Sequence, residues 1–566
     1  MKNSLIAKLL YDIADLLELQ NVQFKPNAYR AAARTIEGMS KDIESEWKEG
    51  RLYDVPGVGK GIGEKIEEFL ATEKSSYLEE LKKKLPMDPE LMNIEGMGPK
   101  KVMFLYKKLK IRTMKDLEES AKKGKIRKLP GFGEKSEQKI LSGIEHAKKG
   151  SGRMLLGFAL PIANEIISEL RSSKLVTNAA LAGSARRMKE TVGDLDILAI
   201  SSKAGKVMDY FCSMPNVIET ISRGPTKASV RLVNGLQVDL RVLPEKEYGS
   251  ALMYFTGNKD HNVALRKIAI AKKMKLSEYG LFKNNKQIAG KTEEEVYNKL
   301  GMHYIPPEMR ENTGEVELAL KNKLPAIVER KDVLCDLQMH SKWSDGSNTI
   351  EEMAAKAGEL GHKYIAITDH AGTLVIANSM NEKRAAKYCE EIDSINKKSE
   401  IHILKGTEVN IMPSGSLDIP DKCLKNFDIV LCSVHSALTM QKEEMTKRIL
   451  KAMDNKYMRI WAHPTGRKIK IRDGYTVDFP KIFDKAKERG IALEIDCYPD
   501  RTDLNDINVR SAVEAGVKLS IGTDAHAAPQ LDFINLGVGT ARRGWAKKSD
   551  IINTMPLEKM MKFLAH

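Results

Sequence analysis

Two aspartates, Asp194 and Asp196, are separated by one residue in the segment Gly-Asp-Leu-Asp at 193–196. Side chains alternate along a β-strand, so these carboxylates would project from one face and could share a divalent cation. A third carboxylate, Asp239, lies in the apolar run 236–242, which is typical of a neighbouring strand. Three carboxylates can hold two hard cations about 3.5–4 Å apart, which is the arrangement that two-metal phosphoryl transfer needs.

Pairs of the form Asp-x-Asp are also common in surface loops, so the flanking residues decide between the two interpretations. Asp196 is followed by Ile-Leu-Ala-Ile, which favours a position at the mouth of a buried strand. Upstream, Gly183 and Ser184 form a small-residue turn whose N–H groups and hydroxyl could approach phosphate oxygens. The pattern predicts a helix over 155–170 and strands over 181–199 and 229–243 around this site.

A pattern of two glycines around one apolar residue occurs three times in the first third of the chain, each time between short helical stretches. Paired glycines at a helix start expose backbone N–H groups, which can bind a phosphate without reading base sequence. Ordinary helix-loop-helix turns are the alternative, but three copies with one spacing favour phosphate binding. The glycines are Gly57, Gly59, Gly96, Gly98, Gly131 and Gly133.

Length, charge and cysteine content narrow the class of protein. The chain has 566 residues, which suggests roughly three to five compact units, and a net charge of +15. The charge favours a partner with a phosphate backbone, with an anionic membrane surface as the alternative. The sequence contains no long apolar run and no signal-peptide core, so we expect a cytoplasmic protein. Six cysteines without C-x-x-C spacing argue against a disulfide framework or a zinc ribbon.

From residue 333 onward, short apolar runs alternate with helical stretches, and nearly every run ends on a potential metal ligand. Repeated β-α units with polar groups at the carboxyl ends of their strands predict a TIM-like barrel with its site at that face. A satisfied core histidine is the usual explanation for a single such residue, but not for a whole series at equivalent places. The residues are His340, Asp345, His370, Glu408, His435, His463, Asp524 and His526.

The first part of the chain, about residues 1–315, resembles the family X DNA polymerases. The resemblance begins with Lys-Pro-Asn-Ala-Tyr-Arg at 25–30, ahead of the first glycine hairpin, and continues through the aspartate strand to Tyr-Phe-Thr-Gly at 254–257. It implies that Asp194, Asp196 and Asp239 hold Mg²⁺ or Mn²⁺ and catalyse nucleotide addition. In this family the Tyr-Phe segment acts as a sugar gate, although two such aromatics could also be helix-packing residues. The nucleotide-binding residues that the resemblance implies are Gly183, Ser184, Arg187, Arg153, Tyr254, Phe255, Gly257 and Asn262.

The lead domain of family X polymerases grips the 5′ phosphate at a DNA gap. By position, Lys65 matches the lysine that some members use as a Schiff-base nucleophile to remove a 5′-deoxyribose phosphate; the alternative is one more phosphate-binding cation. The chain departs from the family pattern nearby, because a second lysine of the pattern falls on Gly61. The DNA-binding residues implied are Lys25, Tyr29, Gly57, Gly59, Gly96, Gly98, Gly131, Gly133 and Arg266.

The carboxy-terminal motifs D-L-x-x-H, S-D-G, T-D-H, G-x-E, x-H-S, A-H-P and D-A-H resemble the PHP (polymerase and histidinol phosphatase) domain, a metal-dependent phosphoesterase. The resemblance implies that the residues at the run ends bind Mn²⁺ and/or Zn²⁺, up to three ions. Gln338 stands where the family has the first histidine of an H-x-H pair. A glutamine carbonyl binds a transition metal more weakly than imidazole does, so Gln338 would hold one ion loosely.

Both resemblances in one chain are those of the bacterial and archaeal type of family X polymerase. They imply a multidomain α+β and α/β fold with helix-hairpin-helix domains, a nucleotidyltransferase palm with a thumb, and a TIM-like (β/α)7 PHP barrel. The expected parts are an N-terminal helix-hairpin-helix domain over 1–85, fingers over 86–150, palm over 151–245, thumb over 246–315, linker over 316–332 and PHP domain over 333–566.

The function that these resemblances imply is the filling of short gaps in gapped or nicked DNA with dNTPs, in base-excision or break repair. A monomer would combine this activity with a 3′–5′ exonuclease, and with activity on abasic sites or on a 5′-deoxyribose phosphate. Two alternatives stay open at this point. One is a polymerase with an inactive structural barrel, and the other is a DNA-binding repair nuclease with a degenerate palm.

Overall fold

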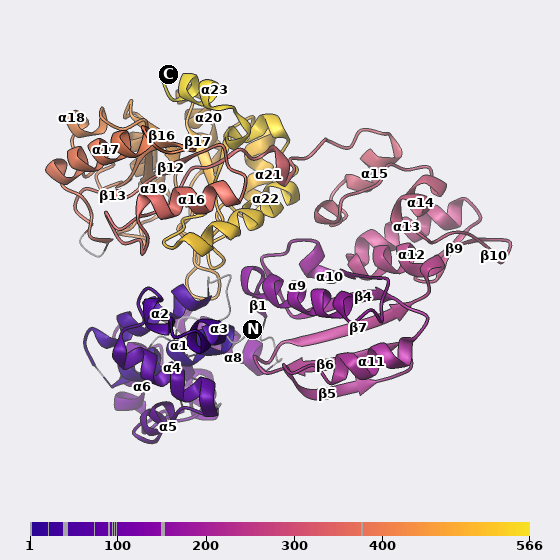
Figure 1. Ribbon diagram of the computed structural model, residues 1–566. Helices are drawn as coiled ribbons and strands as arrows, with labels where there is room; N and C mark the ends of the chain where they lie inside the picture. The colour runs from indigo at the N-terminus through magenta and orange to yellow at the C-terminus, as the bar shows by residue number, and fades with distance from the viewer. Residues whose placement is uncertain are drawn as a thin grey trace. The chain divides into compact units, whose positions relative to one another are not determined.

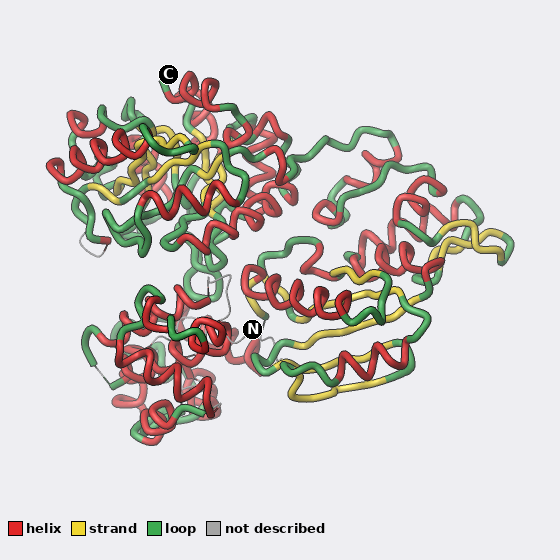
Figure 2. Tube along the Cα trace, viewed as in Figure 1, coloured by secondary structure: helices red, strands yellow, loops and turns green. Residues whose placement is uncertain are grey.

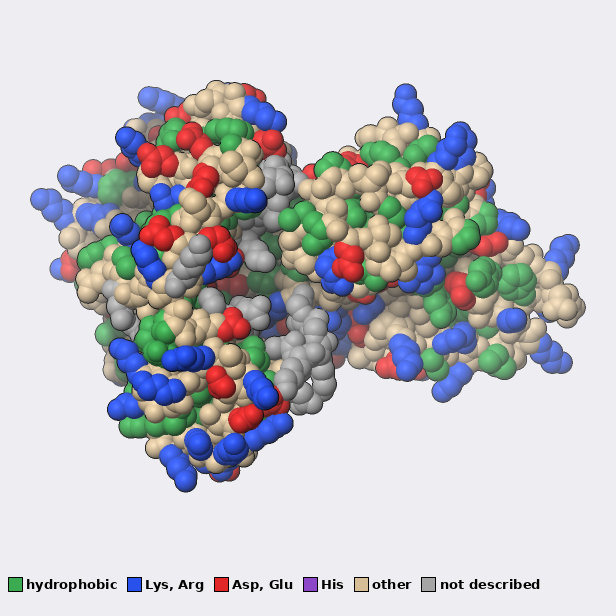
Figure 3. Space-filling view, turned by 90° about the horizontal axis from the view of Figure 1, so that it is seen from below, with side chains coloured by type: hydrophobic (Ala, Val, Ile, Leu, Met, Phe, Trp, Pro, Cys, Tyr) green, Lys and Arg blue, Asp and Glu red, His purple; other side chains and the backbone are tan. Residues whose placement is uncertain are grey.

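The computed structural model describes residues 3–20, 22–37, 43–72, 74–88, 91, 92, 94, 97, 99–148, 153–374 and 377–565 (Figure 1). The chain forms two compact units, one made of residues 1–152 and 468–473 and the other made of residues 153–467 and 474–566. Within the described ranges, no helix has the length and apolarity that crossing a membrane would require. Lysine and arginine side chains are spread over the face shown in Figure 3, among fewer acidic ones, as the net charge of +15 leads one to expect.

The described residues of the first unit up to residue 148 form helices joined by short connections. Its core is formed by apolar residues at helical spacing, such as Ile6, Leu10 and Ile13 on α1, all of which are fully buried. Thr113 and Asp116 form a capping box that starts α7. The elements are α1 (Asn3–Leu19), α2 (Lys25–Glu37), α3 (Ile43–Lys48), the 3-10 turn η1 (Leu52–Asp54), α4 (Lys60–Thr72), α5 (Ser76–Lys83), α6 (Pro99–Leu109), α7 (Met114–Lys122) and α8 (Glu134–Lys148).

The expected palm, which lies in the second unit, is built on a five-stranded sheet in the order β2-β4-β7-β6-β5, in which only β4 and β7 are parallel (Figure 2). Helices α9 and α11 supply apolar side chains to its core, among them Ala163 and Phe211. The elements are β1 (Met154–Leu155), α9 (Leu156–Ser172), β2 (Asn178–Leu181), α10 (Gly183–Arg186), β3 (Thr191–Val192), β4 (Asp194–Ile200), α11 (Ala204–Cys212), β5 (Val217–Arg223), β6 (Lys227–Leu232) and β7 (Gln237–Leu243).

The strand expected over 181–199 is wrong in detail. A short helix, α10, begins at Gly183, and the strand that carries the aspartates starts only at Asp194. Gly183 has a φ of +63°, which breaks the extended backbone after β2. The strand expected over 229–243 is likewise two strands, β6 and β7, joined by a tight turn at Gly235.

The segment after the palm carries a small antiparallel sheet, β10-β9-β8, and several short helices. Its elements are α12 (Glu245–Thr256), α13 (Lys259–Ala271), β8 (Lys275–Ser277), β9 (Gly280–Lys283), β10 (Lys286–Ala289), α14 (Glu293–Lys299), η3 (Pro307–Met309) and α15 (Glu315–Leu320). Helix α15 begins one residue before the stretch expected to be a linker over 316–332 and overlaps it.

A buried ion network joins this segment to the palm. Arg186 of α10 donates two hydrogen bonds, of 3.0 and 2.6 Å, to the carboxylate of Glu293, which also accepts one of 2.6 Å from the fully buried Arg310. Burial alone would raise the pKa of Glu293, but the two arginines lower it to about 2. Because removing one member of such a network strands a buried charge, the network fixes α10 to α14.

The remainder of the chain is a parallel barrel. Seven strands follow one another in the order β11-β12-β14-β15-β16-β17-β18, with β13 paired to β14, and a parallel bridge between Met339 and Ala525 links the last strand region to the first. The strands are β11 (Cys335–Asp336), β12 (Tyr364–Ile367), β13 (His370–Ala371), β14 (His402–Asn410), β15 (Ile429–Ser433), β16 (Met458–Trp461), β17 (Ala492–Asp496) and β18 (Leu519–Gly522).

Helices surround the barrel strands, most of which are apolar and buried along their whole length, as expected when a parallel sheet is covered on both faces (Figures 1 and 2). The six cysteines are all free thiols, and five of them are buried. The helical elements are η4 (Arg330–Asp332), α16 (Ile350–Glu359), α17 (Glu382–Asn396), α18 (Asp421–Leu424), α19 (Lys442–Ala452), α20 (Phe479–Arg489), α21 (Asp506–Ala515), η6 (Ala528–Phe533), α22 (Ile534–Arg543), η7 (Lys548–Asp550), η8 (Ile552–Thr554) and α23 (Leu557–Leu564).

Candidate active sites

The palm sheet brings the three predicted carboxylates together. Strands β4 and β7 are parallel neighbours in a register that pairs Asp196 with Asp239. Asp194 stands two residues before Asp196, so it belongs to the same face of β4. The opposite positions on both strands, such as Leu195 and Val238, are fully buried in the palm core. The alternation predicted from the sequence is therefore present, with carboxylates on one face and apolar side chains on the other.

The three carboxylates differ in their electrostatic surroundings. Burial, together with the charges of Asp194 and Asp239, raises the pKa of Asp196 to about 6. Burial also raises the pKa of the Asp239 carboxyl, but hydrogen bonds from Gln237, Lys227 and Ser229 outweigh it and hold that pKa below its ordinary value. The Lys227 Nζ lies 3.0 Å from Asp239 Oδ2, and the Gln237 Nε2 lies 2.9 Å from Oδ1. A crowded group of carboxylates of this kind is a suitable site for a divalent cation.

The pKa of Asp196 predicts how stability depends on pH when divalent metal is removed. A carboxyl whose folded pKa of about 6 exceeds its ordinary value binds more protons when folded, so stability falls as the pH rises through about 4 to 6. Asp196→Asn removes the buried charge, and we expect it to gain up to about 2 kcal/mol over the wild type at pH 8 in EDTA. Thermal unfolding of both proteins at pH 4 to 8 checks this; equal pH profiles would contradict it.

Gly183 lies directly against Asp196. A Cβ at position 183 would come within 2.3 Å of Asp196 Oδ2, and the Ala182 N–H donates a 2.7 Å hydrogen bond to the Asp196 carbonyl. The turn that carries Ser184 is therefore packed onto the aspartate strand, where its backbone N–H groups start α10. Only a residue without a side chain fits both the positive φ and this close approach.

Replacing Gly183 by alanine should therefore damage the palm site. The left-handed backbone costs a non-glycine residue about 1–2 kcal/mol, and the new methyl group must displace the Asp196 carboxylate. We expect a lower unfolding midpoint and a loss of nucleotide addition of about 100-fold, measured as kcat/KM. Gly205→Ala on α11 is the matched control, since a Cβ there meets no atom within 4 Å. An active Gly183→Ala protein would show that the turn does not position Asp196.

The other predicted nucleotide-binding residues lie around the carboxyl end of α12. Asn262 Nδ2 donates a 2.7 Å hydrogen bond to the Tyr254 carbonyl, and Arg187 Nε donates one of 3.2 Å to Glu311 while its Nη1 donates to the Thr256 carbonyl. Gly257, with a φ of +68°, stands beside both the Arg187 and the Asn262 side chains. The structure thus brings Arg187, Tyr254, Gly257 and Asn262 together, with the Arg187 guanidinium held by protein acceptors.

The aromatic pair and the two remaining arginines have separate surroundings. The rings of Tyr254 and Phe255 meet edge to face at 5.1 Å, and the Arg241 guanidinium lies 4.3 Å over the Phe255 ring. Exposed Arg153 donates hydrogen bonds to the Thr191 hydroxyl and carbonyl at 2.9 and 2.6 Å, next to the aspartate strand. Arg266 is exposed on α13. Phe255 is therefore partly a packing residue, as the alternative interpretation of the sequence expected.

In the first unit, most of the residues predicted to bind a 5′ phosphate line one pocket of about 380 Å³, although Gly57 does not line it. Gly57 has a φ of +84°, and the first N–H groups of α4, which follows it, lack acceptors within the helix. Lys65 Nζ lies 4.9 Å from the centre of the Tyr77 ring. Burial, together with Tyr77, raises the pKa of Tyr29 to about 12, so its hydroxyl stays protonated. The pocket residues include Lys25, Tyr29, Gly59, Lys60, Gly61, Lys65 and Tyr77.

The third glycine hairpin repeats part of this arrangement. Gly131 has a φ of +81°, and α8 begins directly after Gly133. Gly96 and Gly98, of the second hairpin, lie outside the described residues.

In the barrel, the predicted ligands converge at the carboxyl ends of the strands. Their donor atoms form three groups in each of which all lie within 4.8 Å of one another. All eight residues predicted from the run ends belong to these groups. The groups are His340, Asp345, His370 and His526; Glu408, His435 and His463; and His340, Glu408 and Asp524.

Glu408 is the centre of this cluster, fully enclosed at the end of β14. Its Oε1 lies 3.3 Å from His435 Nε2 and 3.0 Å from His463 Nε2. Its Oε2 lies 3.4 Å from His340 Nε2 and 3.9 Å from His370 Nδ1. Burial raises the pKa of Glu408, but the surrounding histidines outweigh it and hold the pKa well below its ordinary value.

This donor set fits divalent cations. Both ring nitrogens of the buried His340 lack a hydrogen-bond partner among the described residues, as does His463 Nδ1. Imidazole and carboxylate donors in such proximity suit zinc or manganese. Gln338 also enters the cluster: its Nε2 donates a 2.9 Å hydrogen bond to Glu408 Oε2, while its buried Oε1 is unpaired. The amide thus presents one oxygen, a weaker ligand than imidazole, where the family pattern has histidine.

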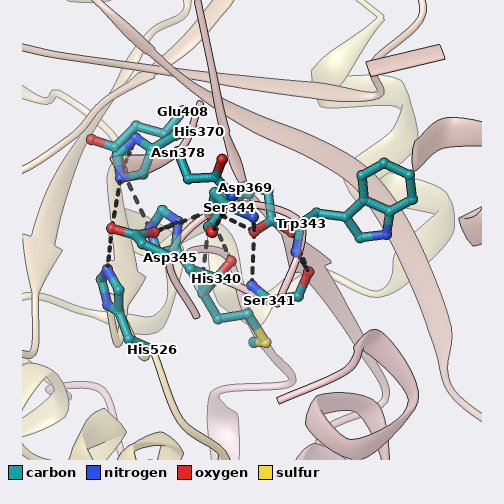
Figure 4. Close-up of polar contacts among 12 residues, drawn as sticks. His340, Ser341, Trp343, Ser344, Asp345, Asp369, His370, Asn378, Glu408 and His526 are labelled. Atoms are coloured by element: carbon teal, nitrogen blue, oxygen red, sulfur yellow. Dashed lines mark hydrogen bonds and ion pairs between the residues drawn. The ribbon is translucent and has the colours of Figure 1, made fainter. Parts of the chain in front are cut away.

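Several supporting residues escaped the sequence analysis. Asp369 accepts hydrogen bonds from the backbone and hydroxyl groups of Ser341 and Ser344, at 2.5–3.0 Å, and so holds the loop that carries Asp345 (Figure 4). In the same view Asp345 points towards His526 and His370. Asp369 adjoins a predicted ligand in the T-D-H motif, which was a usable signal.

Two further buried carboxylates, Glu494 and Asp496, end β17 near the cluster. Burial raises the pKa of both well above the ordinary value. The carboxylate of Glu494 accepts a 2.8 Å hydrogen bond from the His463 N–H. The sequence run that contains Glu494 and Asp496 lacks a histidine, so the sequence analysis did not predict that these carboxylates lie near the ligand cluster.

Carboxylates on a mixed sheet beside the glycine turn define a nucleotidyltransferase. The histidines and acidic residues that converge at the strand ends of the barrel define a metal-dependent phosphoesterase joined to it. Known families match the same parts: a helix-hairpin-helix domain at 1–75, a SAM-like helix-hairpin-helix tandem at 88–145, the DNA polymerase beta thumb at 251–311 and the PHP domain at 336–496. The predicted fold class is confirmed.

Over its full length the chain is similar to the DNA polymerase/3′-5′ exonuclease PolX of Bacillus subtilis (strain 168), with 37% identity across 99% of this chain and 98% of that protein. The chain belongs to the PolX family. The barrel alone is similar to probable phosphatases. One from Thermoanaerobacter sp. (strain X514) is 33% identical over 32% of this chain and 74% of its own length, and one from Syntrophotalea carbinolica is 26% identical over 40% and 95%.

Proposed function

We propose that this protein is a family X DNA polymerase that fills short gaps in DNA and also trims 3′ ends as a 3′–5′ exonuclease. The observation that supports this most directly is the pairing of Asp196 with Asp239 on parallel strands, beside Gly183, in a chain of the PolX family. The cluster around Glu408 supports the second activity. The partners are gapped or nicked DNA and a dNTP, and the protein acts as a monomer in the cytoplasm, where these substrates occur.

In the palm, Asp194, Asp196 and Asp239 would hold Mg²⁺ or Mn²⁺, which lower the pKa of the primer 3′ hydroxyl and neutralise phosphate charge. The backbone and hydroxyl of Ser184, with Gly183, would orient the triphosphate of the dNTP, and Arg153 would neutralise it. Tyr254 to Gly257 would face the sugar. Asn262 and Arg266 would contact the nascent base pair and the template.

The hydrogen bonds of Arg187 constrain how this residue could bind the triphosphate in the palm. Its guanidinium donates to Glu311 and to the Thr256 carbonyl. Contact of its Nε edge with the triphosphate would therefore require Arg187 to exchange the Glu311 carboxylate for a phosphate oxygen. Such an exchange keeps the arginine paired throughout and avoids leaving a half-buried charge without a partner.

In the barrel, the eight ligands and Gln338 would hold up to three Mn²⁺ or Zn²⁺ ions, which activate water for attack on a phosphodiester. Asp369 holds the Asp345 loop in place, and the His463 N–H is fixed by Glu494. The enclosure of Glu408 and His340 excludes bulk water from the inner part of the site. Abasic-site cleavage and removal of a 3′ phosphate are reactions of the same chemical class.

Assays of the full-length protein test both activities. With a one-nucleotide gap, the templated dNTP and Mg²⁺, we expect addition of one nucleotide in a single turnover. With a 3′-tailed duplex, Mn²⁺ and no dNTP, we expect stepwise loss of 3′ nucleotides. Degradation without extension would favour a repair nuclease with a degenerate palm. Extension without degradation would favour a structural barrel.

For the first unit, we propose that Lys65 binds the 5′ phosphate at the gap as a cation. The Tyr77 ring face stabilises a charged ammonium, whereas a Schiff-base nucleophile must lose its proton. We expect Lys65→Ala to reduce the preference for a 5′-phosphorylated over a 5′-hydroxyl gap about tenfold, measured as binding affinity. Borohydride treatment on a 5′-deoxyribose-phosphate end should trap no adduct; a trapped adduct that Lys65→Ala abolishes would assign the lyase role instead.

A further inference from the structure

One arginine of the barrel, Arg501, forms an ion pair with a predicted metal ligand. It lies in the loop that follows β17, at the end of the barrel where the ligands also lie. Its Nε is 3.3 Å from Asp496 Oδ2 and 3.5 Å from Asp524 Oδ2. The other oxygen of Asp524, Oδ1, is 3.1 Å from His340 Nε2. Arg501 and His340 therefore flank a single carboxylate.

The Arg501 guanidinium approaches both carboxylates most closely through its Nε. This atom makes the shortest contact in each of its two ion pairs. No hydrogen bond joins its two terminal amino groups to a described residue. The other buried arginines of the barrel differ. Arg448 donates its terminal amino groups to the carbonyls of Ser436 and Ile411, and Arg330 donates to those of Val333 and Leu360. Among the described residues, Arg501 therefore differs from Arg448 and Arg330 in that its terminal amino groups have no hydrogen-bond acceptor.

Arg501 is also partly accessible to solvent, and its positive charge is paired with a predicted metal ligand. Its side chain is 14% exposed, whereas Asp496 beneath it is fully buried. Among the described residues, no other lysine or arginine is ion-paired with one of the eight predicted ligands. The two terminal amino groups of Arg501 thus place a positive charge and hydrogen-bond donors next to the ligand cluster. The carboxylates of Asp496 and Asp524 orient the guanidinium from its Nε side.

We propose that Arg501 is a substrate-binding residue of the barrel that donates its terminal amino groups to the nonbridging oxygens of the scissile phosphate. The proposal rests on the phosphoesterase function proposed above. A planar guanidinium matches two phosphate oxygens at once, which an ammonium group cannot do. Asp496 and Asp524 hold the Nε edge, so the fork is oriented before substrate arrives.

The chemistry of the step explains what such a contact would contribute. In hydrolysis an oxygen of water bonds to phosphorus, and the bond from phosphorus to the 3′ oxygen of the preceding nucleotide breaks. That oxygen takes up a proton that the water releases. Negative charge gathers on the nonbridging oxygens during the step and stays on the nucleoside 5′-monophosphate that leaves. Arg501 is therefore expected to bind this product as well as the transition state.

Product binding provides a test that does not depend on turnover. Deoxyadenosine 5′-monophosphate is titrated into the full-length protein with Mn²⁺ by calorimetry, for the wild type, Arg501→Met, Arg501→Lys and Arg489→Met. Arg489 is an exposed arginine at the end of α20 and serves as the matched control. Bound manganese is counted for each protein by elemental analysis, and gap extension in the same preparations shows that they are folded.

We expect Arg501→Met to bind the monophosphate at least about tenfold more weakly and to lose about 100-fold in kcat/KM for 3′ degradation. Its manganese content should match the wild type, and Arg501→Lys should lie between the two because it keeps the charge without the fork. Monophosphate affinity within twofold of the wild type would overturn the proposal. Loss of manganese in Arg501→Met and Arg501→Lys alike would also overturn it, because the arginine would then act only by positioning Asp524.

The failure of the two proposals can be told apart. A wild-type protein that degrades no 3′ end with Mn²⁺ would refute the exonuclease function. Arg501-dependent binding of the monophosphate would still support the assigned phosphate contact in that case. A wild type that degrades 3′ ends while Arg501→Met does so equally well would refute the contact alone.

Discussion

Replacing Asp194 by alanine should abolish nucleotide addition while leaving 3′ degradation unchanged. Asp194 is one of three carboxylates on the same face of strands β4 and β7. The half-buried carboxyl of Asp196 lies beside it and has a pKa of about 6. Without Asp194, the site loses one of its three anionic ligands, and two carboxylates remain to hold cations and a triphosphate. We expect kcat/KM for filling a one-nucleotide gap to fall at least about 1,000-fold.

The measurement is single-turnover extension with Mg²⁺, followed by degradation of a 3′-tailed duplex with Mn²⁺ by the same preparation. Asp209→Ala is the matched control, since Asp209 is a largely exposed aspartate on α11 of the same palm. His340→Ala should show the reverse pattern, with extension kept and degradation lost. Extension by Asp194→Ala at a wild-type rate would exclude this strand as the polymerase site.

Replacing Glu408 by glutamine should abolish 3′ degradation and reduce the number of bound metal ions. Each Glu408 oxygen lies 3.0–3.9 Å from two histidine nitrogens, so one carboxylate takes part in two of the three ligand groups. The amide of glutamine has nearly the same shape, but one oxygen becomes an NH₂ group that cannot ligate a cation. We expect a fall of at least about 1,000-fold in degradation rate.

Elemental analysis of bound manganese and zinc provides a readout for Glu408→Gln that does not depend on activity. Gap extension by the same variant should remain at the wild-type rate, which shows that the palm is folded. Glu443→Gln, at an exposed position on α19, controls for the loss of a glutamate in the barrel. Full metal content together with full degradation in Glu408→Gln would refute a metal centre at this place.

The ligands were predictable from the sequence because nearly every apolar run of the barrel ends on or just before one of them. In a parallel barrel, the carboxyl end of every strand reaches the same face, so residues distant in sequence, such as His340 and Asp524, must converge. The three palm carboxylates were predictable for a related reason. The period of two in a strand fixes which side chains share a face, and Asp194, Asp196 and Asp239 satisfy it.

What the sequence did not predict depends on contacts between distant segments. Nothing in the local pattern around Lys227 indicates that it lies beside Asp239, because the turn between β6 and β7 sets that register. The sequence indicated a small-residue turn at Gly183 and Ser184, but not that residues 183–186 form a short helix, α10. The pairing of Arg187 with Glu311 joins residues 124 positions apart, which no periodicity indicates.

The network of Arg186, Glu293 and Arg310 leads to an expectation about the accuracy of copying. Arg186 ends α10, the short helix that also carries Ser184, and its guanidinium is bound to a glutamate on α14. We expect a movement of the α12–α14 segment in response to the shape of a new base pair to reach the groups proposed to orient the triphosphate. Discrimination between correct and incorrect nucleotides is then expected to depend on residues that touch neither the nucleotide nor the DNA.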